Sequence, residues 1–169
     1  DPSEVLTLLD HAVKKNDTEL SDLIRLGMWS GCRIEELCAL KVVDVKGNFF
    51  SVTDAKTAAG RRDVPIHSEL ATTISSLIGT RKGGYVLKTL TPNKYGDRSN
   101  AIGKRFGRLK REAGFSQSHV FHSIRKTVVT ILENKGVTEN IVADIFDHLL
   151  ASLKSFDLEL FELPSNFKV

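Results

Sequence analysis

Apolar residues recur every three or four positions along most of the chain, which is the spacing typical of amphipathic α-helices. Seven helices are predicted on this basis, over residues 1–15, 19–31, 33–41, 68–79, 99–114, 122–136 and 138–153. Pro2 suits the first turn of the first helix, and Gly31 and Gly136 suit helix ends. The last helix can extend no further than Pro164, because proline lacks the backbone N–H that a helix interior needs.

The period of the pattern changes to two between these helices. The segments "GNFFSVTD" (47–54) and "RRDVPIH" (61–67) are rich in β-prone residues and flank the polar stretch "AKTAAG" (55–60). This arrangement predicts an antiparallel hairpin, with Pro65 on an edge strand or at a strand end. A loop is expected over 83–97, where Gly, Thr, Pro and Asn gather. The predicted fold class is mainly α with a small antiparallel β-sheet.

The totals fit one globular domain without a membrane segment. The chain has 169 residues, of which 41% are hydrophobic, enough for a single core. Its apolar runs are much shorter than a membrane span, and it does not open on a secretory signal. Cys32 and Cys38 lack the spacing of a metal site and are expected to be buried thiols in a reducing, cytoplasmic compartment. We therefore expect one domain over residues 1–169.

Charge is distributed unevenly, although the net charge is only +3. Residues 81–112 contain ten Lys and Arg against two acidic residues, a local balance of +8. Residues 139–169 contain six acidic residues against two Lys, a local balance of −4. A basic stretch of this size favours the docking of a polyanion on one side of the domain. A solvated helix face is the alternative interpretation of the same charges.

Three segments place charged residues beside apolar ones, where a partner is needed to offset the cost of burial. The first, "SGCRIEEL", contains Arg33 and Glu36; the second, "DAKTAAGRRDVPI", contains Lys56; the third, "FHSIRKT", contains His122 and Arg125. Helical spacing puts the last two residues on one face. Each segment also has a simpler interpretation, such as a surface ion pair or a solvated lysine.

A metal site is one alternative for the histidines. Its candidate ligands come from the second half of the chain: His119, His122 and His148, with either Asp144 or Asp147. Their spacing matches no strong zinc pattern, and the cationic Arg125 beside them would disfavour a divalent ion. A metal-dependent hydrolase using these histidines stays open as an alternative function. A Ser–His–Asp hydrolase has less support, since no nucleophile-elbow pattern is present.

The same segments, taken together, fit metal-free chemistry at a phosphodiester. The forked donors of Arg33 and Arg125 can hold nonbridging oxygens and neutralise the charge that develops in the transition state. Lys56 can protonate a leaving oxygen, because neighbouring cations lower the pKa of a lysine. His122 and His148 can donate hydrogen bonds or move protons. This chemistry needs no metal or nucleotide, so no cofactor is expected.

The order of these motifs resembles the catalytic domain of tyrosine recombinases, the phage-integrase family. "SGCRIEEL" with "CALKVVDV" is similar to the family's first arginine box, and "KTAAGRRDVPI" to its β-hairpin lysine element. "HSIRKT" is similar to its His-x-x-Arg box, and "VADIFDH" stands where the family ends a helix in Gly-His. The resemblance implies a mainly helical fold with a small sheet on the DNA-facing side. It also implies a set of catalytic residues, with Glu36 in support: Arg33, Lys56, His122, Arg125 and His148.

Two positions depart from the family pattern. Asp147 stands where the family has Gly, and no tyrosine follows His148 at the distance of about two to three helical turns expected for the nucleophile. Phe156 is the aromatic residue nearest to that position, and it has no hydroxyl with which to attack phosphorus. The chain's two tyrosines, Tyr85 and Tyr95, lie in the basic loop. We therefore expect an altered tail, or a nucleophile donated by another copy, and no strand cleavage by this chain alone.

The resemblance implies site-specific recombination by a phage, prophage or genomic-island integrase, with cleavage and rejoining through a 3′-phosphotyrosine. The expected partner is double-stranded DNA at a crossover site, bound by a homo-oligomer, and the amino-terminal DNA-binding domains usual in integrases are absent from this sequence. Phosphate contacts are expected from the basic helix over 99–114: Lys104, Arg105, Arg108 and Arg111. Its apolar stripe is expected to face the core: Ile102, Phe106 and Leu109. The alternatives are a non-catalytic DNA-binding remnant of an integrase and a protein-binding helical domain.

Overall fold

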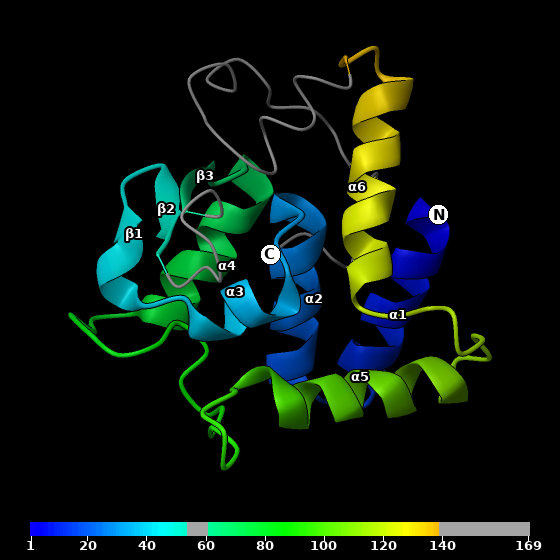
Figure 1. Ribbon diagram of the computed structural model, residues 1–169, viewed down its shortest axis with the longest axis horizontal. Helices are drawn as coiled ribbons and strands as arrows, with labels where there is room; N and C mark the ends of the chain where they lie inside the picture. Colours follow the sequence, from blue (N-terminus) through cyan, green and yellow to red (C-terminus); the bar gives the residue numbers. More distant parts are fainter. Residues whose placement is uncertain (54–60, 139–169) are drawn as a thin grey trace.

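Six of the predicted helices lie in the residues that the computed structural model describes, 1–53 and 61–138 (Figure 1). They are α1 (Pro2–Lys14), α2 (Thr18–Ser30), α3 (Ile34–Ala39), α4 (Ser68–Ile78), α5 (Ser99–Glu112) and α6 (His122–Asn134). These six predictions are confirmed, with ends that differ by a few residues. The helix predicted over 138–153 lies outside the described residues from position 139 onward.

Helix α2 is the centre of the fold. Nine of its 13 residues are buried, and it contacts α1, α3, α4, α5 and α6. Figure 1 shows α1 and α6 on one side of it, the sheet and α4 on the other, and α5 running across one end. Because its apolar residues surround the helix axis, α2 can be stable only inside the core.

Local sequence sets the ends of the first two helices. Asp1 caps α1 by accepting a hydrogen bond from the Glu4 backbone N–H at 3.1 Å. Asp17 caps α2 in the same way, with the Leu20 N–H at 3.2 Å. Gly31 ends α2 with a φ of 61°, a left-handed conformation that glycine adopts without steric cost. The chain turns there into α3.

The sheet has three antiparallel strands in the order β1 (Val45–Lys46), β2 (Phe49–Val52) and β3 (Arg62–Pro65). Strands β2 and β3 are the predicted hairpin, in a register that pairs Phe50 with Val64. Pro65 is the last residue of an edge strand, which is a position that tolerates its missing N–H. The predicted fold class, mainly α with a small antiparallel sheet, is confirmed.

Helix α3 ends earlier than the sequence pattern predicts. Leu40 is extended, with φ −60° and ψ 125°, and the chain beyond it pairs with a distant segment. The Val42 N–H donates to the Gly84 carbonyl oxygen at 2.9 Å, and the Val86 N–H donates to the Leu40 carbonyl oxygen at 2.9 Å. Long-range pairing thus overrides the local helical pattern. A short 3-10 turn, η1 (Val42–Asp44), then leads into β1.

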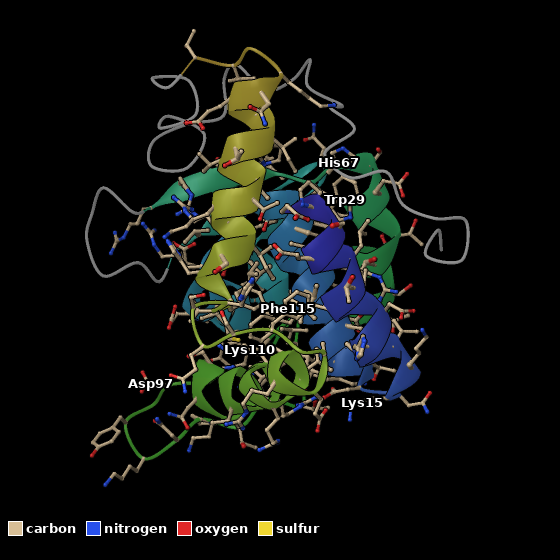
Figure 2. The ribbon with its side chains drawn as sticks, turned by 90° about the vertical axis from the view of Figure 1, so that its right-hand side faces the viewer. Lys15, Trp29, His67, Asp97, Lys110 and Phe115 are labelled. Carbon is tan, nitrogen blue, oxygen red and sulfur yellow. The ribbon has the colours of Figure 1, made fainter. Side chains whose placement is uncertain are left out.

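The predicted loop before α5 is fastened at its base by an arginine. Arg98 donates hydrogen bonds to the carbonyl oxygens of Cys38 at 2.9 Å and Leu87 at 2.7 Å. Its guanidinium also lies 3.6 Å from the centre of the Tyr85 ring. Figure 2 shows the part of the loop near Asp97 projecting away from the helices. The loop therefore has a fixed base and a projecting tip.

Both cysteines are free and buried, as predicted. Burial, assisted by the charge of Glu35, raises the pKa of the Cys38 thiol to about 12, so this thiol stays protonated at neutral pH. Within residues 1–53 and 61–138, no helix is long and apolar enough to cross a membrane.

Candidate functional site

The turn between α2 and α3 carries the first candidate arginine. Its sequence is "SGCRIEEL", in which Arg33 is the extended N-cap residue of α3. The Arg33 backbone N–H donates a hydrogen bond to Glu36 Oε2 at 2.8 Å, and this bond fixes the first turn of the helix. The Arg33 side chain is 45% exposed. Its guanidinium is therefore accessible to a ligand.

Glu36 is a buried carboxylate that binds two arginines. Arg33 Nη1 donates to Oε1 at 3.0 Å, while Arg62 donates from both terminal nitrogens, Nη1 to Oε1 at 3.0 Å and Nη2 to Oε2 at 2.8 Å. Burial pushes the pKa of Glu36 up, but the hydrogen bonds from Arg62 and Arg33 more than offset this and hold the pKa below its ordinary value. Glu36 is therefore an anion at neutral pH.

Arg62, the first residue of β3, is a site residue that the sequence analysis missed. Its side chain is 1% exposed, and Nη2 also lies 3.5 Å from Cys32 Sγ. Alternation along β3 puts Arg62 on the same buried face as Val64. An arginine on the inward face of a predicted strand needs a buried anion, so this alternation is the signal that could have identified it.

Helix α6 supplies the second candidate arginine. Arg125 is 9% exposed, and its Nη1 donates a hydrogen bond to the Gly31 carbonyl oxygen at 2.9 Å. Burial, followed by the charges of Arg33 and Arg62, lowers the pKa of Arg125. The three guanidinium groups are thus near enough to repel one another, and an anion among them would relieve that repulsion.

His122 is the exposed first residue of α6, one turn before Arg125. Partial burial of the ring and the charges of Arg125, Lys126 and Arg33 lower the pKa of His122. The imidazole is consequently neutral at neutral pH, with one nitrogen able to donate and the other able to accept.

We name this group the arginine cluster: Arg33, Glu36, Arg62, His122 and Arg125. It is assembled from α3, β3 and α6, which are far apart in the sequence. Arg33 and Arg62 bind the Glu36 carboxylate, and Arg125 binds the Gly31 carbonyl oxygen two residues before Arg33. With a neutral imidazole, the charges of these five side chains sum to +2. Forked donors with excess positive charge are the chemistry that proteins use to bind phosphate.

Several candidate residues lie outside the described residues: Lys56, Asp144, Asp147, His148 and Phe156. His119 is described, and its Nε2 lies 3.4 Å from Glu4 Oε1 of α1 rather than in the arginine cluster. Across residues 1–53 and 61–138, no group of three or more His, Cys, Asp and Glu side chains is arranged to hold a metal ion.

Helix α5 has an apolar inner face and a basic outer face. Ile102, Phe106 and Leu109 are buried, as predicted. Three of the four predicted phosphate contacts are exposed: Lys104, Arg108 and Arg111. These three cations are accessible to a polyanion.

Arg105 has a different environment from the other three cations. Its Nε donates to Asp17 Oδ2 at 3.0 Å, and its Nη1 donates to Glu19 Oε2 at 2.9 Å. Both carboxylates lie at the amino end of α2, where negative charge is favourable. Arg105 therefore joins α5 to α2, and its contact with phosphate stays a prediction.

Comparison with known proteins identifies the class to which this fold and cluster belong. The family model described as "Phage integrase family" matches residues 1–153. The chain therefore belongs to the phage integrase family, and the resemblance to tyrosine recombinases drawn from its motifs is confirmed.

Two curated relatives have related names. A "Tyrosine recombinase" of Pseudothermotoga lettingae is 28% identical over 163 residues, which is 94% of this chain and 55% of the relative. A "Probable integrase/recombinase" of Acholeplasma phage L2 is 29% identical over 137 residues, which is 79% of this chain and 46% of the relative. The chain thus spans about half the length of the curated relatives that it matches.

Solved structures share the fold at low sequence identity. The lambda integrase catalytic core matches with a TM-score of 0.67 and 17% identity, over 88% of this chain and 94% of that one. XerA recombinase matches with a TM-score of 0.67 and 20% identity, over 99% of this chain and 59% of that one. The Tn1549 transposon integrase matches with a TM-score of 0.68 and 23% identity, over 99% of this chain and 63% of that one. The fold is that of a tyrosine recombinase catalytic domain.

Proposed function

We propose that residues 1–169 form the catalytic domain of a site-specific DNA recombinase and that the arginine cluster binds the phosphodiester to be cleaved. The observation that carries this proposal is that both arginines are held at the turn between α2 and α3. Arg33 lies in this turn, with its backbone N–H bonded to Glu36, and Arg125 donates a hydrogen bond to the Gly31 carbonyl oxygen of the same turn. Guanidinium groups are cations with forked donors, and a pair of them suits the two nonbridging oxygens of a phosphodiester. Family membership supports the same interpretation.

The proposed roles follow from the chemistry of each side chain. Arg33 and Arg125 hold the nonbridging oxygens and stabilise the charge that builds on them in the transition state. His122 donates a hydrogen bond to the same phosphate or accepts a proton from the attacking hydroxyl. Lys56 and His148, which lie outside the described residues, are proposed as the proton donor to the leaving 5′-oxygen and as a second hydrogen-bond donor.

The attacking group in this reaction is a tyrosine hydroxyl, which forms a bond to phosphorus while the bond to the 5′-oxygen breaks. The sequence contains two tyrosines, Tyr85 and Tyr95, and none after His148. The Tyr85 ring is covered by the Arg98 guanidinium, and Tyr95 lies in the loop before α5. We therefore expect DNA binding without a covalent link from this chain alone. A tyrosine near position 156, or one donated by another copy, would supply the link.

Double-stranded DNA and a second copy of the chain are the proposed partners. Structures with the same fold include a lambda integrase dimer bound to a COC′ core site and a lambda integrase tetramer bound to a Holliday junction. On this chain, the exposed cations of α5 are proposed to contact phosphates on either side of the arginine cluster. A non-catalytic DNA-binding descendant is the second candidate, and the absence of tyrosine from residues 149–169 favours it.

One experiment tests binding and cleavage separately. A crossover site is first selected from random duplexes by its affinity for the chain, and binding is then measured by fluorescence anisotropy at several salt concentrations. A nicked suicide substrate carrying the selected site is next scored for a protein–DNA band that survives denaturation. Binding without such a band is expected for the chain as it stands. The variant Phe156→Tyr tests whether a tyrosine at this position restores the covalent band.

Two outcomes would count against these proposals. Failure to bind duplex DNA at low salt would overturn both candidate functions, the recombinase and the non-catalytic DNA-binding descendant. A covalent band from the unmodified chain, mapped to Tyr85 or Tyr95, would overturn the assignment of the nucleophile position.

A further inference from the structure

Arg62 belongs to the arginine cluster but lies too deep in the protein to act on DNA itself. Its side chain is 1% exposed, so it cannot touch a DNA phosphate. It nevertheless binds the carboxylate of the arginine cluster with both terminal nitrogens, in two hydrogen bonds to Glu36 at 2.8 and 3.0 Å. Paired, planar donors of this kind fix the orientation of a carboxylate.

The carboxylate that Arg62 orients is the one that orients Arg33. Each oxygen of Glu36 accepts one bond from Arg62 and one from Arg33: Oε1 from Arg33 Nη1 at 3.0 Å, and Oε2 from the Arg33 backbone N–H at 2.8 Å. Exposure rises along this chain of contacts, from 1% for Arg62 to 6% for Glu36 and 45% for Arg33. A buried, rigid pair therefore supports an exposed cation.

We propose that Arg62 is a positioning residue, which fixes the Glu36 carboxylate so that Glu36 in turn holds the Arg33 guanidinium toward the phosphate. The inference rests on the proposed function, because it assigns the purpose of a contact within the same site. Without Arg62, the charges of Glu36 and Arg33 would cancel one another. With Arg62, these three side chains together carry a net charge of +1.

Arg62 also joins the sheet to this support. It is the first residue of β3, which pairs antiparallel with β2 through Val52. Glu36 belongs to α3, so the two hydrogen bonds tie the loop end of the hairpin to the helix that Arg33 caps. A displacement of either element would change the direction in which Arg33 points.

The first test measures Arg33 without DNA, so it does not depend on the proposed function. The order of the Arg33 Nε–Hε group is measured by heteronuclear NMR in the wild type, in Arg62→Met and in Arg62→Lys. We expect the group to be ordered in the wild type and mobile in both variants, because a lysine cannot form the paired contact. Arg25→Met is the matched control, since Arg25 pairs with Asp22 inside α2, and it should leave Arg33 ordered. Unchanged order of Arg33 in a folded Arg62 variant would overturn the proposal.

The second test measures charge through binding to the selected duplex. Arg62→Met should weaken binding about tenfold and lower the salt slope by about one unit, the effect of losing one phosphate contact. The double variant Arg62→Met/Glu36→Gln removes both charges of the buried pair, and it should regain the slope while Arg33 stays mobile. A double variant with the same slope as Arg62→Met would overturn the charge argument.

Folding is controlled within the same set of variants. Arg62→Met leaves Glu36 with one partner fewer in a buried place, so it is the variant most prone to unfold. If it unfolds, Arg62→Lys and the double variant decide the proposal, because neither leaves that anion without compensation. A wild type that fails to bind DNA would overturn the proposed function, and the order of Arg33 would still decide the role of Arg62.

Discussion

Arg125 and Gly31 are joined by a hydrogen bond from the guanidinium of one to the carbonyl oxygen of the other, over 2.9 Å. Gly31 ends α2, and Arg33 follows it by two residues. The bond thus fixes Arg125 relative to the backbone that carries Arg33. Any change in the approach of α6 to α2 must displace one candidate arginine relative to the other.

Helix α2 lies close to the start of α6 at Gly27, where substitution should be costly. A Cβ atom at this position would lie 2.9 Å from Phe121 Cζ, and the Phe121 ring is buried against Phe106, with ring centres 5.4 Å apart. We expect Gly27→Ala to lower the free energy of unfolding by about 1–2 kcal/mol. Overpacking costs about 1–3 kcal/mol, and the higher helix propensity of alanine offsets up to about 1 kcal/mol of that cost. Chemical denaturation measures the change.

Gly107→Ala is the matched control on α5. A Cβ atom there has no neighbouring atom within 4 Å, so the free energy of unfolding should rise by about 0.5–1 kcal/mol. Gly27→Ala should also weaken DNA binding more than Gly107→Ala does, because it displaces the start of α6. The same sign of stability change in both variants would contradict the close approach of Phe121 to Gly27.

His122 should gain a proton when the cluster binds an anion. Partial burial and the neighbouring cations lower its pKa in the free protein, so the imidazole is neutral at neutral pH. A bound phosphodiester offsets those cations and favours the imidazolium, and DNA binding should therefore raise the pKa of His122 and tighten as pH falls toward 6. The titration of the His122 Cε1–H resonance with and without duplex DNA measures the shift.

Two surface substitutions provide the controls for this titration. Lys126→Gln removes a cation that lowers the pKa of His122, and it should raise that pKa in the free protein. Glu35→Gln removes an anion that raises the pKa of His122, and this variant should therefore lower the pKa in the free protein. A midpoint that responds to neither substitution would mean that the charges of Lys126 and Glu35 do not reach the imidazole.

Glu36 should make the stability of the domain depend on pH on the acid side. Its folded-state pKa is lowered, because the hydrogen bonds from Arg62 and Arg33 outweigh the effect of burial. A carboxyl of this kind stabilises the fold above its unfolded pKa, and that contribution disappears as pH falls through the folded pKa. Near neutral pH, Glu36→Gln should therefore cost about 3 kcal/mol, and the difference from the wild type should shrink as the pH is lowered below about 4.5.

Denaturation at a series of pH values measures this contribution. Glu35→Gln, an exposed position on the same helix, should keep a nearly constant and small difference from the wild type across the series. A Glu36→Gln difference that grows on acidification would contradict a lowered pKa for Glu36 in the folded protein.

The outer face of α5 should contribute to DNA affinity through charge alone. The double variant Lys104→Ala/Arg108→Ala removes two exposed cations, and it should lower the salt slope by about two units on every duplex tested. Arg105→Ala is the control, because its guanidinium is engaged by Asp17 and Glu19. It should lower the free energy of unfolding by about 1–2 kcal/mol and leave the slope unchanged. The reverse pattern would assign the phosphate contact to Arg105.

The helices were predictable because each is specified by nearby residues. Gly31 marks the end of α2 in the sequence and in the structure, and the spacing of His122 and Arg125 alone indicates the face that they share on α6. Local hydrogen bonding and apolar periodicity decide such features, so a sequence is sufficient for them.

The contacts that complete the site depend on residues far apart in the chain. Glu36 and Arg62 are 26 positions apart, and their pairing follows from the approach of α3 to the sheet. Arg105 and Arg108 look equivalent in the sequence, and only the amino end of α2 gives Arg105 its carboxylates. Long-range placement of this kind has no periodic signal. Alternation along β3 is the partial exception, since it puts Arg62 on the buried face.

The anchoring of the loop before α5 has an evolutionary consequence. Arg98 fastens the base of the loop to the end of α3 through the carbonyl oxygens of Cys38 and Leu87, while the tip near Asp97 projects into solvent (Figure 2). Residues can be exchanged or inserted at the tip without disturbing the anchor. The domain thus separates a segment that is free to change in sequence from the proposed catalytic centre, where the arginine cluster has to keep its geometry.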